Sequence, residues 1–126
     1  NVHIMVRRKS ENKRQIGTAY EQLAAAYLME QGYEIVTLNY RIRTGEIDIV
    51  AKDGEYLCFV EVKYRSDDRA GSGLCAVNIR KQRTIIRVAQ YYMMQHGLDE
   101  WTPCRFDVVS IDGEEITLIQ NAFQLC

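Results

Sequence analysis

The chain has 126 residues, enough for one domain with a single core. Its composition, 47% hydrophobic and 26% charged, is that of an ordinary soluble globular protein, and no apolar run approaches the roughly 18 residues that a membrane span needs. The net charge of -1 argues against a protein that coats nucleic acid non-specifically.

The cysteines and the N-terminal residues predict the cellular compartment of the protein. Residues 1–14 contain no apolar stretch of the kind found in signal peptides. The four cysteines lie far apart without a Cys-x-x-Cys pair, and the chain has two histidines, so we do not expect a structural zinc site. We expect a cytoplasmic protein with reduced thiols, in which Cys58 and Cys104 are small core residues.

Two basic segments flank an acidic body. Residues 1–18 carry five cations against one acid, and residues 79–88 carry four cations and no acid. This distribution suits a phosphate-binding rim around a metal-binding centre. A mobile basic tail and a solvated helix face would give the same charges. We expect residues 1–13 to form a flexible basic segment and residues 14–126 to form one domain.

The first half of the chain predicts one helix and three strands. Apolar residues at three- and four-residue steps indicate a helix over 14–31, and Gly32 is a typical C-terminal cap. Three strands follow over 33–38, 46–52 and 55–64, with turns at Thr44-Gly45 and Asp53-Gly54.

The second half predicts a loop, a helix and a hairpin. A polar loop over 65–73 precedes a helix over 77–96, and strands over 104–111 and 115–119 are joined by a turn at Asp112-Gly113. The second helix is long enough for a crossover, so the third and fourth strands can pair in parallel. We therefore predict an α/β (mixed α+β) fold of order α-β-β-β-α-β-β, with a central mixed sheet and a helix on each side.

Acidic residues occupy positions where a buried strand would prefer apolar side chains. Because side chains alternate along a strand, Glu46 and Asp48 should share one face, and Ile47 and Ile49 the other. Charges within apolar strands are costly unless they are paired or bind a metal.

The turn between the second and third strands decides whether the acids converge. A two-residue turn at Asp53-Gly54 would pair Asp48 with Phe59 and place Glu61 diagonal to Asp48 on the same face. A three-residue loop would put the two acids on opposite faces. The Asp-Gly dipeptide favours the first register.

Converging carboxylates predict a cation. Carboxylates this close repel one another and raise each other's pKa unless a cation lies between them, and an oxygen-only ligand set suits Mg²⁺ or Mn²⁺. Lys63 follows Glu61 on the same face, where an ammonium can orient an attacking water or stabilise charge on a phosphate. This set is typical of phosphodiester hydrolysis. A solvated strand with Lys63 paired to Glu61 is the alternative interpretation.

Glu21, on the first helix, is a further candidate. Small residues share its stripe and would allow substrate or metal to approach closely: Gly17, Ala24 and Ala25. An ordinary surface glutamate is the alternative.

Together these residues resemble the PD-(D/E)xK nuclease superfamily, the restriction-endonuclease-like fold, since Asp48 followed by Glu61-x-Lys63 matches its core signature. More narrowly, the chain resembles the UPF0102 or YraN-like family of small bacterial proteins, and its layout is similar to that of archaeal Holliday-junction resolvases. The matching segments are Gly17-x-x-Tyr20-Glu21-x-x-Ala24, Asn39-Tyr40-Arg41, Gly45-Glu46-Ile47-Asp48, Phe59-Val60-Glu61-Val62-Lys63-Tyr64-Arg65, Lys81 and Arg105-Phe106-Asp107-Val108-Val109.

The resemblance implies a role for each matching position. Asp48 and Glu61 would bind Mg²⁺ or Mn²⁺ with the backbone carbonyl of Val62, and Lys63 would be the catalytic lysine. Glu21 would complete the catalytic set from the first helix. Glu21 and Glu46 are further candidate metal ligands. Ile47 stands where the superfamily pattern has proline.

Basic residues around this core predict contacts to nucleic acid. The candidate phosphate-binding residues are Arg41, Arg43, Arg65, Arg80, Lys81 and Arg83. For Tyr40 and Tyr64 we favour core packing, with stacking on unpaired bases as the alternative.

We expect a metal-dependent endonuclease acting on DNA, on branched or recombination and repair intermediates, with no membrane partner. A homodimer is compatible with the resemblance, because resolvases of this layout commonly act as two-fold dimers. A nucleic-acid-binding module of the same fold without catalysis, and a protein-interaction domain, are the alternatives.

Overall fold

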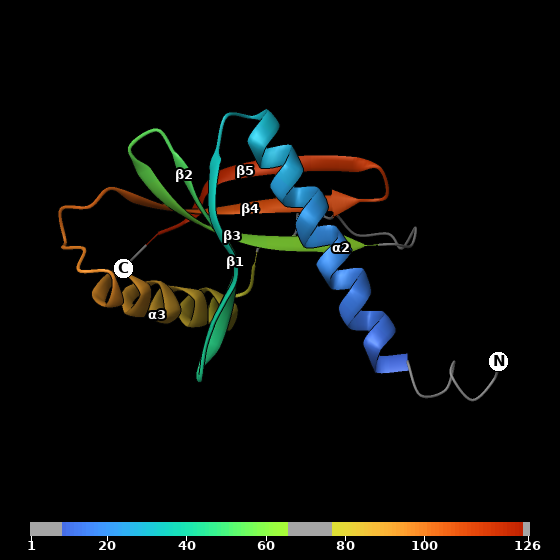
Figure 1. Ribbon diagram of the computed structural model, residues 1–126, viewed down its shortest axis with the longest axis horizontal. Coiled ribbons are helices and arrows are strands. Elements are labelled where there is room, and N and C mark those ends of the chain that lie inside the picture. The colour runs from blue at the N-terminus through green and yellow to red at the C-terminus, as the bar shows by residue number, and fades with distance from the viewer. Residues whose placement is uncertain (1–8, 66–76, 125–126) are drawn as a thin grey trace.

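The computed structural model describes residues 9–65 and 77–124, with side chains from residue 13 onward (Figure 1). Its elements follow the predicted order α-β-β-β-α-β-β. They are α2 (Lys9–Glu30), β1 (Glu34–Ile42), β2 (Gly45–Asp53), β3 (Tyr56–Arg65), α3 (Ile79–Gln95), β4 (Cys104–Asp112) and β5 (Glu115–Phe123).

The five strands form one mixed sheet in the order β1-β2-β3-β4-β5. Neighbouring strands are antiparallel except β3 and β4, which pair in parallel as predicted, because α3 carries the chain back across the sheet. Within the described ranges, neither helix is long and apolar enough to cross a membrane.

Each helix covers one face of the sheet. One core cluster contains α2 residues such as Leu28 together with Cys58 and Val60. The other contains α3 residues such as Val88 together with Phe59. Because Cys58, Phe59 and Val60 alternate between the clusters, the two helices lie on opposite faces, which confirms the predicted arrangement. We call these the α2 face and the α3 face.

Ala24 and Ala25 belong to the core and do not line a site. Their exposed fractions are 0% and 6%, and both pack against the sheet. The expectation that small residues beside Glu21 admit a ligand was therefore wrong for these two positions. Their small size instead allows α2 to lie close to the strands.

Three elements are longer than predicted. The first helix begins at Lys9, so residues 9–13 are part of the helix that was predicted to begin at residue 14. They were missed because a solvated helix end has no apolar stripe. The first strand continues to Ile42 and the last to Phe123.

The hairpin turns lie one residue away from their predicted positions. The pair Asp53↔Tyr56 leaves Gly54-Glu55 as the turn between β2 and β3, and Gly54 has a φ of 61°. The turn between β1 and β2 is Arg43-Thr44, and the turn between β4 and β5 is Gly113-Glu114. In the β2–β3 and β4–β5 turns, Gly54 and Gly113 supply the positive φ at the first turn position instead of the second, whereas neither residue of the Arg43-Thr44 turn has positive φ.

Among the cysteines, Cys58 is buried and Cys104 is half-buried, each as a free thiol. Cys75, Cys126 and nearly all of the predicted loop over 65–73 lie outside the described residues; Arg65 is the last residue of β3.

Candidate functional site

The two strands of the β1–β2 hairpin rotate about midway along their length, so that their side chains change from one face of the sheet to the other. The paired residues Leu38 and Ile49 pack on the α2 face. Two residues further along the hairpin, the paired residues Tyr40 and Ile47 pack on the α3 face. Residues two apart in a regular strand share a face, so both strands must rotate between these pairs. The expectation that Ile47 and Ile49 share a face was therefore wrong. The residue at the pivot of β1 is Asn39, whose φ is 56°.

This rotation separates β2 from β3. The pairing of the two strands ends at Ile49↔Val60, and the next residue of β2 is Asp48. Beyond the last pair, the amide of Val62 donates a 2.8 Å hydrogen bond to Asp48 Oδ2. The carboxylate of Asp48 thus accepts a hydrogen bond that a backbone carbonyl of a paired strand would otherwise accept.

The register differs from the predicted one by two residues. Phe59 pairs with Val50 instead of Asp48, because the turn uses Gly54-Glu55. A shift of two residues preserves the face that each side chain occupies, whereas a shift of one would reverse it. Asp48 and Glu61 therefore still approach each other; the charge of Asp48 raises the pKa of Glu61, whereas a hydrogen bond with Glu61 lowers the pKa of Asp48.

Three carboxylates meet on the α2 side of this gap. Glu21 from α2 and Glu46 and Asp48 from β2 each offer an oxygen, and these oxygens lie within 4.8 Å of one another. Burial and then the charge of Asp48 raise the pKa of Glu21 to about 7, opposed by a hydrogen bond from the Asn39 side chain. Burial also raises the pKa of Asp48, opposed by the amide of Val62.

Glu61 approaches Asp48 from the α3 face. Its side chain is 12% exposed, and its Oε2 lies 3.6 Å from Nζ of Lys81 in the first turn of α3. Its Oε1 is buried and has no hydrogen-bond partner among the described residues. Burial and then the charge of Asp48 raise its pKa to about 8, while Lys81 lowers it. Asp48 therefore lies between a glutamate from each face of the sheet.

The residues of this site fit a divalent cation. The donor set consists of carboxylate oxygens, which suits Mg²⁺ or Mn²⁺. A cation would satisfy the oxygen of Glu61 that has no hydrogen-bond partner among the described residues, and it would offset the repulsion between the clustered carboxylates. Glu61 is not one of the three acids whose oxygens lie within 4.8 Å of one another. Val62 contacts Asp48 through its N–H. That its carbonyl binds the metal stays a prediction.

Lys63 lies next to this cluster along β3. It is half-buried, and it pairs with Ser110 in the parallel register between β3 and β4. Because Phe59 belongs to the α3-face core, regular alternation places Glu61 and Lys63 on the same face.

The predicted phosphate-binding residues fall into two groups. Arg41 and Lys81 contact acids of the site: Arg41 lies 3.4 Å from Glu46, and Lys81 pairs with Glu61. Arg43, Arg80 and Arg83 are exposed, and Arg65 is half-buried. Sequence reasoning predicted no ion pair between the rim and the acids.

The two candidate stacking tyrosines both have aromatic neighbours. Tyr40 packs edge-on against Tyr92 at 5.0 Å, and its hydroxyl donates to Gln95 Oε1 at 2.6 Å, in agreement with the predicted core packing. Tyr64 stacks on Tyr20 at 4.2 Å and is 41% exposed.

Asn39 is the residue that sequence reasoning missed. Asn39 follows directly after the predicted strand over 33–38, and an asparagine is a signal for left-handed backbone because it tolerates this conformation better than other non-glycine residues.

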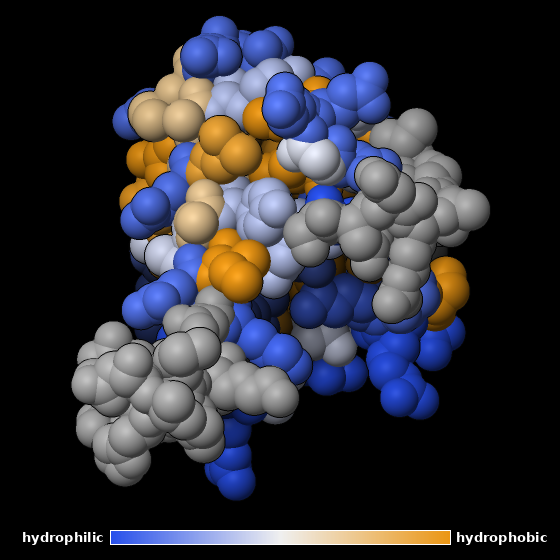
Figure 2. All heavy atoms as spheres, turned by 90° about the vertical axis from the view of Figure 1, so that its right-hand side faces the viewer, coloured by the Kyte–Doolittle hydropathy of each residue, from blue (hydrophilic) through white to orange (hydrophobic). Residues whose placement is uncertain are grey.

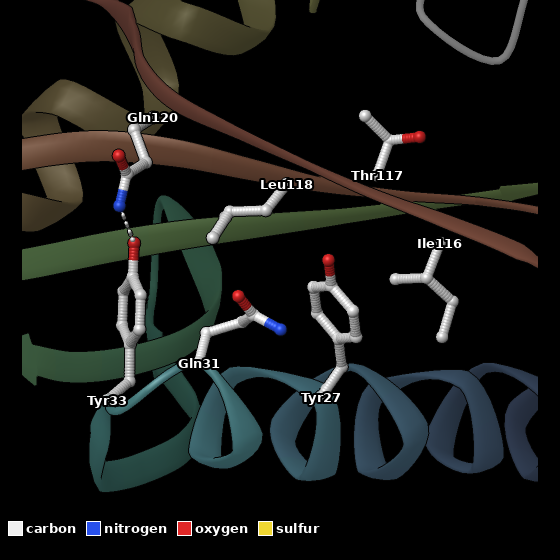
Figure 3. Close-up of a pocket in the computed structure, with 7 residues that line it drawn as sticks. All are labelled: Tyr27, Gln31, Tyr33, Ile116, Thr117, Leu118 and Gln120. Atoms are coloured by element: carbon white, nitrogen blue, oxygen red, sulfur yellow. Dashed lines mark hydrogen bonds between the residues drawn. The ribbon is translucent and has the colours of Figure 1, made fainter.

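A separate cavity of about 440 Å³ lies between the C-terminal end of α2 and β5 (Figure 3). Its lining is uncharged: Tyr27, Gln31, Tyr33, Ile116, Thr117, Leu118 and Gln120. The amide of Gln120 donates to the Tyr33 hydroxyl, which itself donates to the buried Asp107. No residue of the acidic site lines this cavity.

Fold and site together define a mixed α/β domain with an acidic cluster where two strands separate. The chain belongs to the family described as Uncharacterised protein family UPF0102, whose model matches residues 20–111, a range that includes every acid of the cluster. This confirms the predicted family.

Several UPF0102 proteins match over most of their length. The protein from Lachnoclostridium phytofermentans is 54% identical over 112 residues, which is 89% of this chain and 95% of the relative. The one from Syntrophus aciditrophicus is 45% identical over 125 residues, 96% and 97% of the two chains. A UPF0102 protein from Legionella pneumophila is 44% identical over 109 residues, 85% and 92% of the two chains.

Proposed function

We propose that this protein is a metal-dependent endonuclease that hydrolyses phosphodiester bonds in DNA, with branched recombination or repair intermediates as its substrate class. The observation that carries the proposal is the convergence of acids from both faces of the sheet at the gap between β2 and β3, with one buried carboxylate oxygen unpaired among the described residues. A site that serves only to hold the fold together would satisfy that oxygen.

The ligands follow from this geometry. Asp48 and Glu61, with Glu21 and Glu46 beside Asp48, would hold Mg²⁺ or Mn²⁺. The cation supplies Lewis-acid stabilisation of negative charge on the phosphate when bound. Glu21, Glu46 and Asp48 already have oxygens within 4.8 Å of one another, and Glu61 approaches Asp48 from the other face of the sheet.

The lysines supply the remaining positive charge. Lys63 shares a face with Glu61, where its ammonium can orient the attacking water and stabilise charge on the scissile phosphate. Lys81 lies 3.6 Å from Glu61, is 43% exposed, and can exchange that carboxylate for a phosphate oxygen.

Cationic side chains near the site can bind the phosphates of the substrate. The first turn of α3, all of whose residues are described, carries Arg80 and Lys81 and no acid. Arg43 is exposed at the tip of the β1–β2 hairpin. Hydrophilic side chains also predominate in the lower part of the face shown in Figure 2, on the side of Figure 1 where the first turns of α2 lie. A backbone-contacting surface of this kind favours binding by structure over binding by sequence.

A cleavage assay tests the proposal. Purified protein is incubated with duplex, single-stranded, flap and four-way-junction DNA and with an RNA duplex, in Mg²⁺, Mn²⁺ or EDTA. We expect metal-dependent cleavage of a branched DNA that falls at least about 100-fold in Asp48→Asn, Glu61→Gln and Lys63→Ala. Glu55→Gln, in the exposed Gly54-Glu55 turn before the first residue of β3, is the matched control.

Two results would contradict the proposal. Cleavage that persists in all three variants would show that a contaminant or another site acts. Tight DNA binding with no cleavage of any substrate would favour the binding-module interpretation.

The proposal extends to a homodimer acting in the cytoplasm. A branched substrate presents two strands for cleavage, and one small domain covers little of it. Sedimentation with and without a four-way junction measures the stoichiometry, and a 1:1 complex would contradict the dimer.

A further inference from the structure

We propose that a groove between α3 and the end of β5 binds an unpaired strand of the substrate, so that the substrate class is DNA with a single-stranded arm. We call it the α3 groove; its volume is about 380 Å³. This inference rests on the proposed function for the identity of the strand, but its test measures binding and does not require cleavage.

The α3 groove is built on one stripe of the helix. The α3 residues that line it recur at steps of three and four positions: Ile79, Gln82, Arg83, Ile86, Arg87 and Gln90. Gln124, directly after β5, completes the lining. At 1.5 Å per residue the stripe extends roughly 16 Å along the helix. The buried residues Ile85 and Val88 lie on another stripe, so a different side of α3 holds the helix on the sheet.

The α3 groove is cationic. Arg83 and Arg87 are exposed and lie one helical turn apart. All 17 residues of α3 are described and none is an acid, and no acid is among the residues that line the groove. Like charges one turn apart repel each other and weaken the isolated helix. A bound anionic chain would remove this repulsion, so the charge of the groove favours an anionic ligand.

Apolar and amide groups in the groove favour an unpaired strand over a duplex. Ile79 is 58% exposed, and Ile86 is partly buried against the core. The amide nitrogen of Gln82 donates to the Val77 carbonyl at 2.7 Å, which fixes this side chain beside the groove. A duplex keeps its bases stacked and offers this surface its phosphates, whereas an unpaired strand also offers base faces to the isoleucines and base edges to the amides.

The α3 groove begins beside the acidic site. Lys81 lies between Ile79 and Gln82 in the first turn of α3, and its Nζ is 3.6 Å from Glu61 Oε2. A strand with one phosphate at Lys81 can therefore continue along the groove as the next nucleotides of the same chain. An acidic peptide would also satisfy the arginines, but it has no comparable reason to start at a cluster of carboxylates.

The experiment measures the binding of a fluorescein-labelled oligothymidylate by anisotropy, with the full chain in EDTA and over a series of salt concentrations. We expect Arg87→Gln to weaken binding and to make the slope of log affinity against log salt shallower by about 0.7, the value for one phosphate contact on a single strand. Lys52→Gln is the matched control, because it also removes one exposed cation but lies in β2, outside the groove and the acidic cluster.

A second variant tests the apolar part of the groove. Ile79→Gln changes no charge, and its side chain is exposed, so the melting temperature should not fall. We expect its affinity for oligothymidylate to fall at least about threefold, because the strand then covers less apolar surface. The salt slope and the affinity for a duplex should stay the same.

Four results would overturn the inference. Equal salt slopes in Arg87→Gln and Lys52→Gln would exclude a phosphate at Arg87. An equal loss of duplex and single-strand affinity in Ile79→Gln would make the groove a duplex surface. Tighter binding of oligouridylate would make RNA the strand. Tighter binding of polyglutamate than of oligothymidylate, lost in Ile79→Gln, would assign the groove to an acidic protein.

The groove and the nuclease fail in distinguishable ways. If single-strand binding depends on Arg87 and Ile79 but no substrate is cleaved in Mg²⁺, the nuclease is overturned and the groove stands as a strand-binding site. If a flap or junction is cleaved while both variants bind oligothymidylate like the unmodified protein, the groove is overturned and the nuclease stands.

Discussion

The amide of Val62 donates a 2.8 Å hydrogen bond to Asp48 Oδ2 just beyond the last residue pair of β2 and β3. A strand amide that loses its neighbour needs another acceptor, and here a side chain supplies it. Asp48 therefore both ends the pairing of two strands and lies at the centre of the acidic cluster. The same contact lowers the pKa of Asp48 against the effect of burial.

This double role predicts different stabilities for two substitutions that remove the same charge. Asp48→Asn keeps an oxygen that can accept from Val62, whereas Asp48→Ala leaves the amide without that partner. We expect Asp48→Ala to be less stable than Asp48→Asn by about 1–3 kcal/mol in urea unfolding with EDTA present. Equal stabilities would show that the amide finds another acceptor.

Metal binding should depend on pH. The pKa values of Glu21 and Glu61 are raised to about 7 and about 8, chiefly by burial and then by Asp48. The cation binds ionised carboxylates, so protons compete with it and leave when it binds. We expect Mn²⁺ affinity to rise from about pH 6 to about pH 8, with protons released in calorimetry in buffers of different ionisation enthalpy. An affinity that is flat over this range would contradict the raised pKa values.

The metal-free protein should lose stability as pH rises. The pKa of Glu61 is about 8 in the folded chain, against 4.5 as its ordinary value, so the folded state binds the proton more tightly. The contribution of Glu61 to stability is therefore greatest at the acidic end of this window and is lost as pH rises from about 4.5 to about 8.

Urea unfolding in EDTA across that window measures the slope, and Glu61→Gln should flatten it. Added Mg²⁺ should restore stability at the alkaline end, because it binds the ionised carboxylates of the folded state. Stability that rises with pH in EDTA would contradict the raised pKa of Glu61.

Gly45 sets how closely α3 approaches the hairpin. A Cβ at this position would lie 2.5 Å from Thr84 Cγ2 and 3.2 Å from Val88 Cγ2. The Thr84 hydroxyl donates to the carbonyl of Arg80, which limits rotation of its methyl group away. We expect Gly45→Ala to cost about 1–3 kcal/mol of stability.

The matched rescue is Thr84→Ser, which removes the obstructing methyl group and keeps the hydroxyl. In the double variant with Gly45→Ala, most of the loss should be recovered, as thermal melting of the four proteins will measure. A double variant no more stable than Gly45→Ala alone would place the strain elsewhere, for instance at Val88.

The sequence by itself determined the element order, the packing of one helix on each face of a mixed sheet and the candidate acids. These follow from local periodicity: the apolar stripes of both helices and the alternation of β3 are repeated over many residues, so errors of one residue in a turn do not destroy them. The predicted approach of Asp48 and Glu61 survived a register error of two residues, although the hairpin rotates there and Glu61 reaches Asp48 from the α3 face instead of sharing a face with it.

The tertiary structure decided how the site is assembled. Alternation predicted that Ile47 and Ile49 share a face, but the packing of Tyr40 and Ile47 against α3 rotates the hairpin about Asn39. A residue type only permits a left-handed backbone; long-range packing determines whether the chain adopts it. That rotation opens the gap through which Glu21 and Glu61 approach Asp48 from opposite faces, and no local pattern in the sequence encodes it.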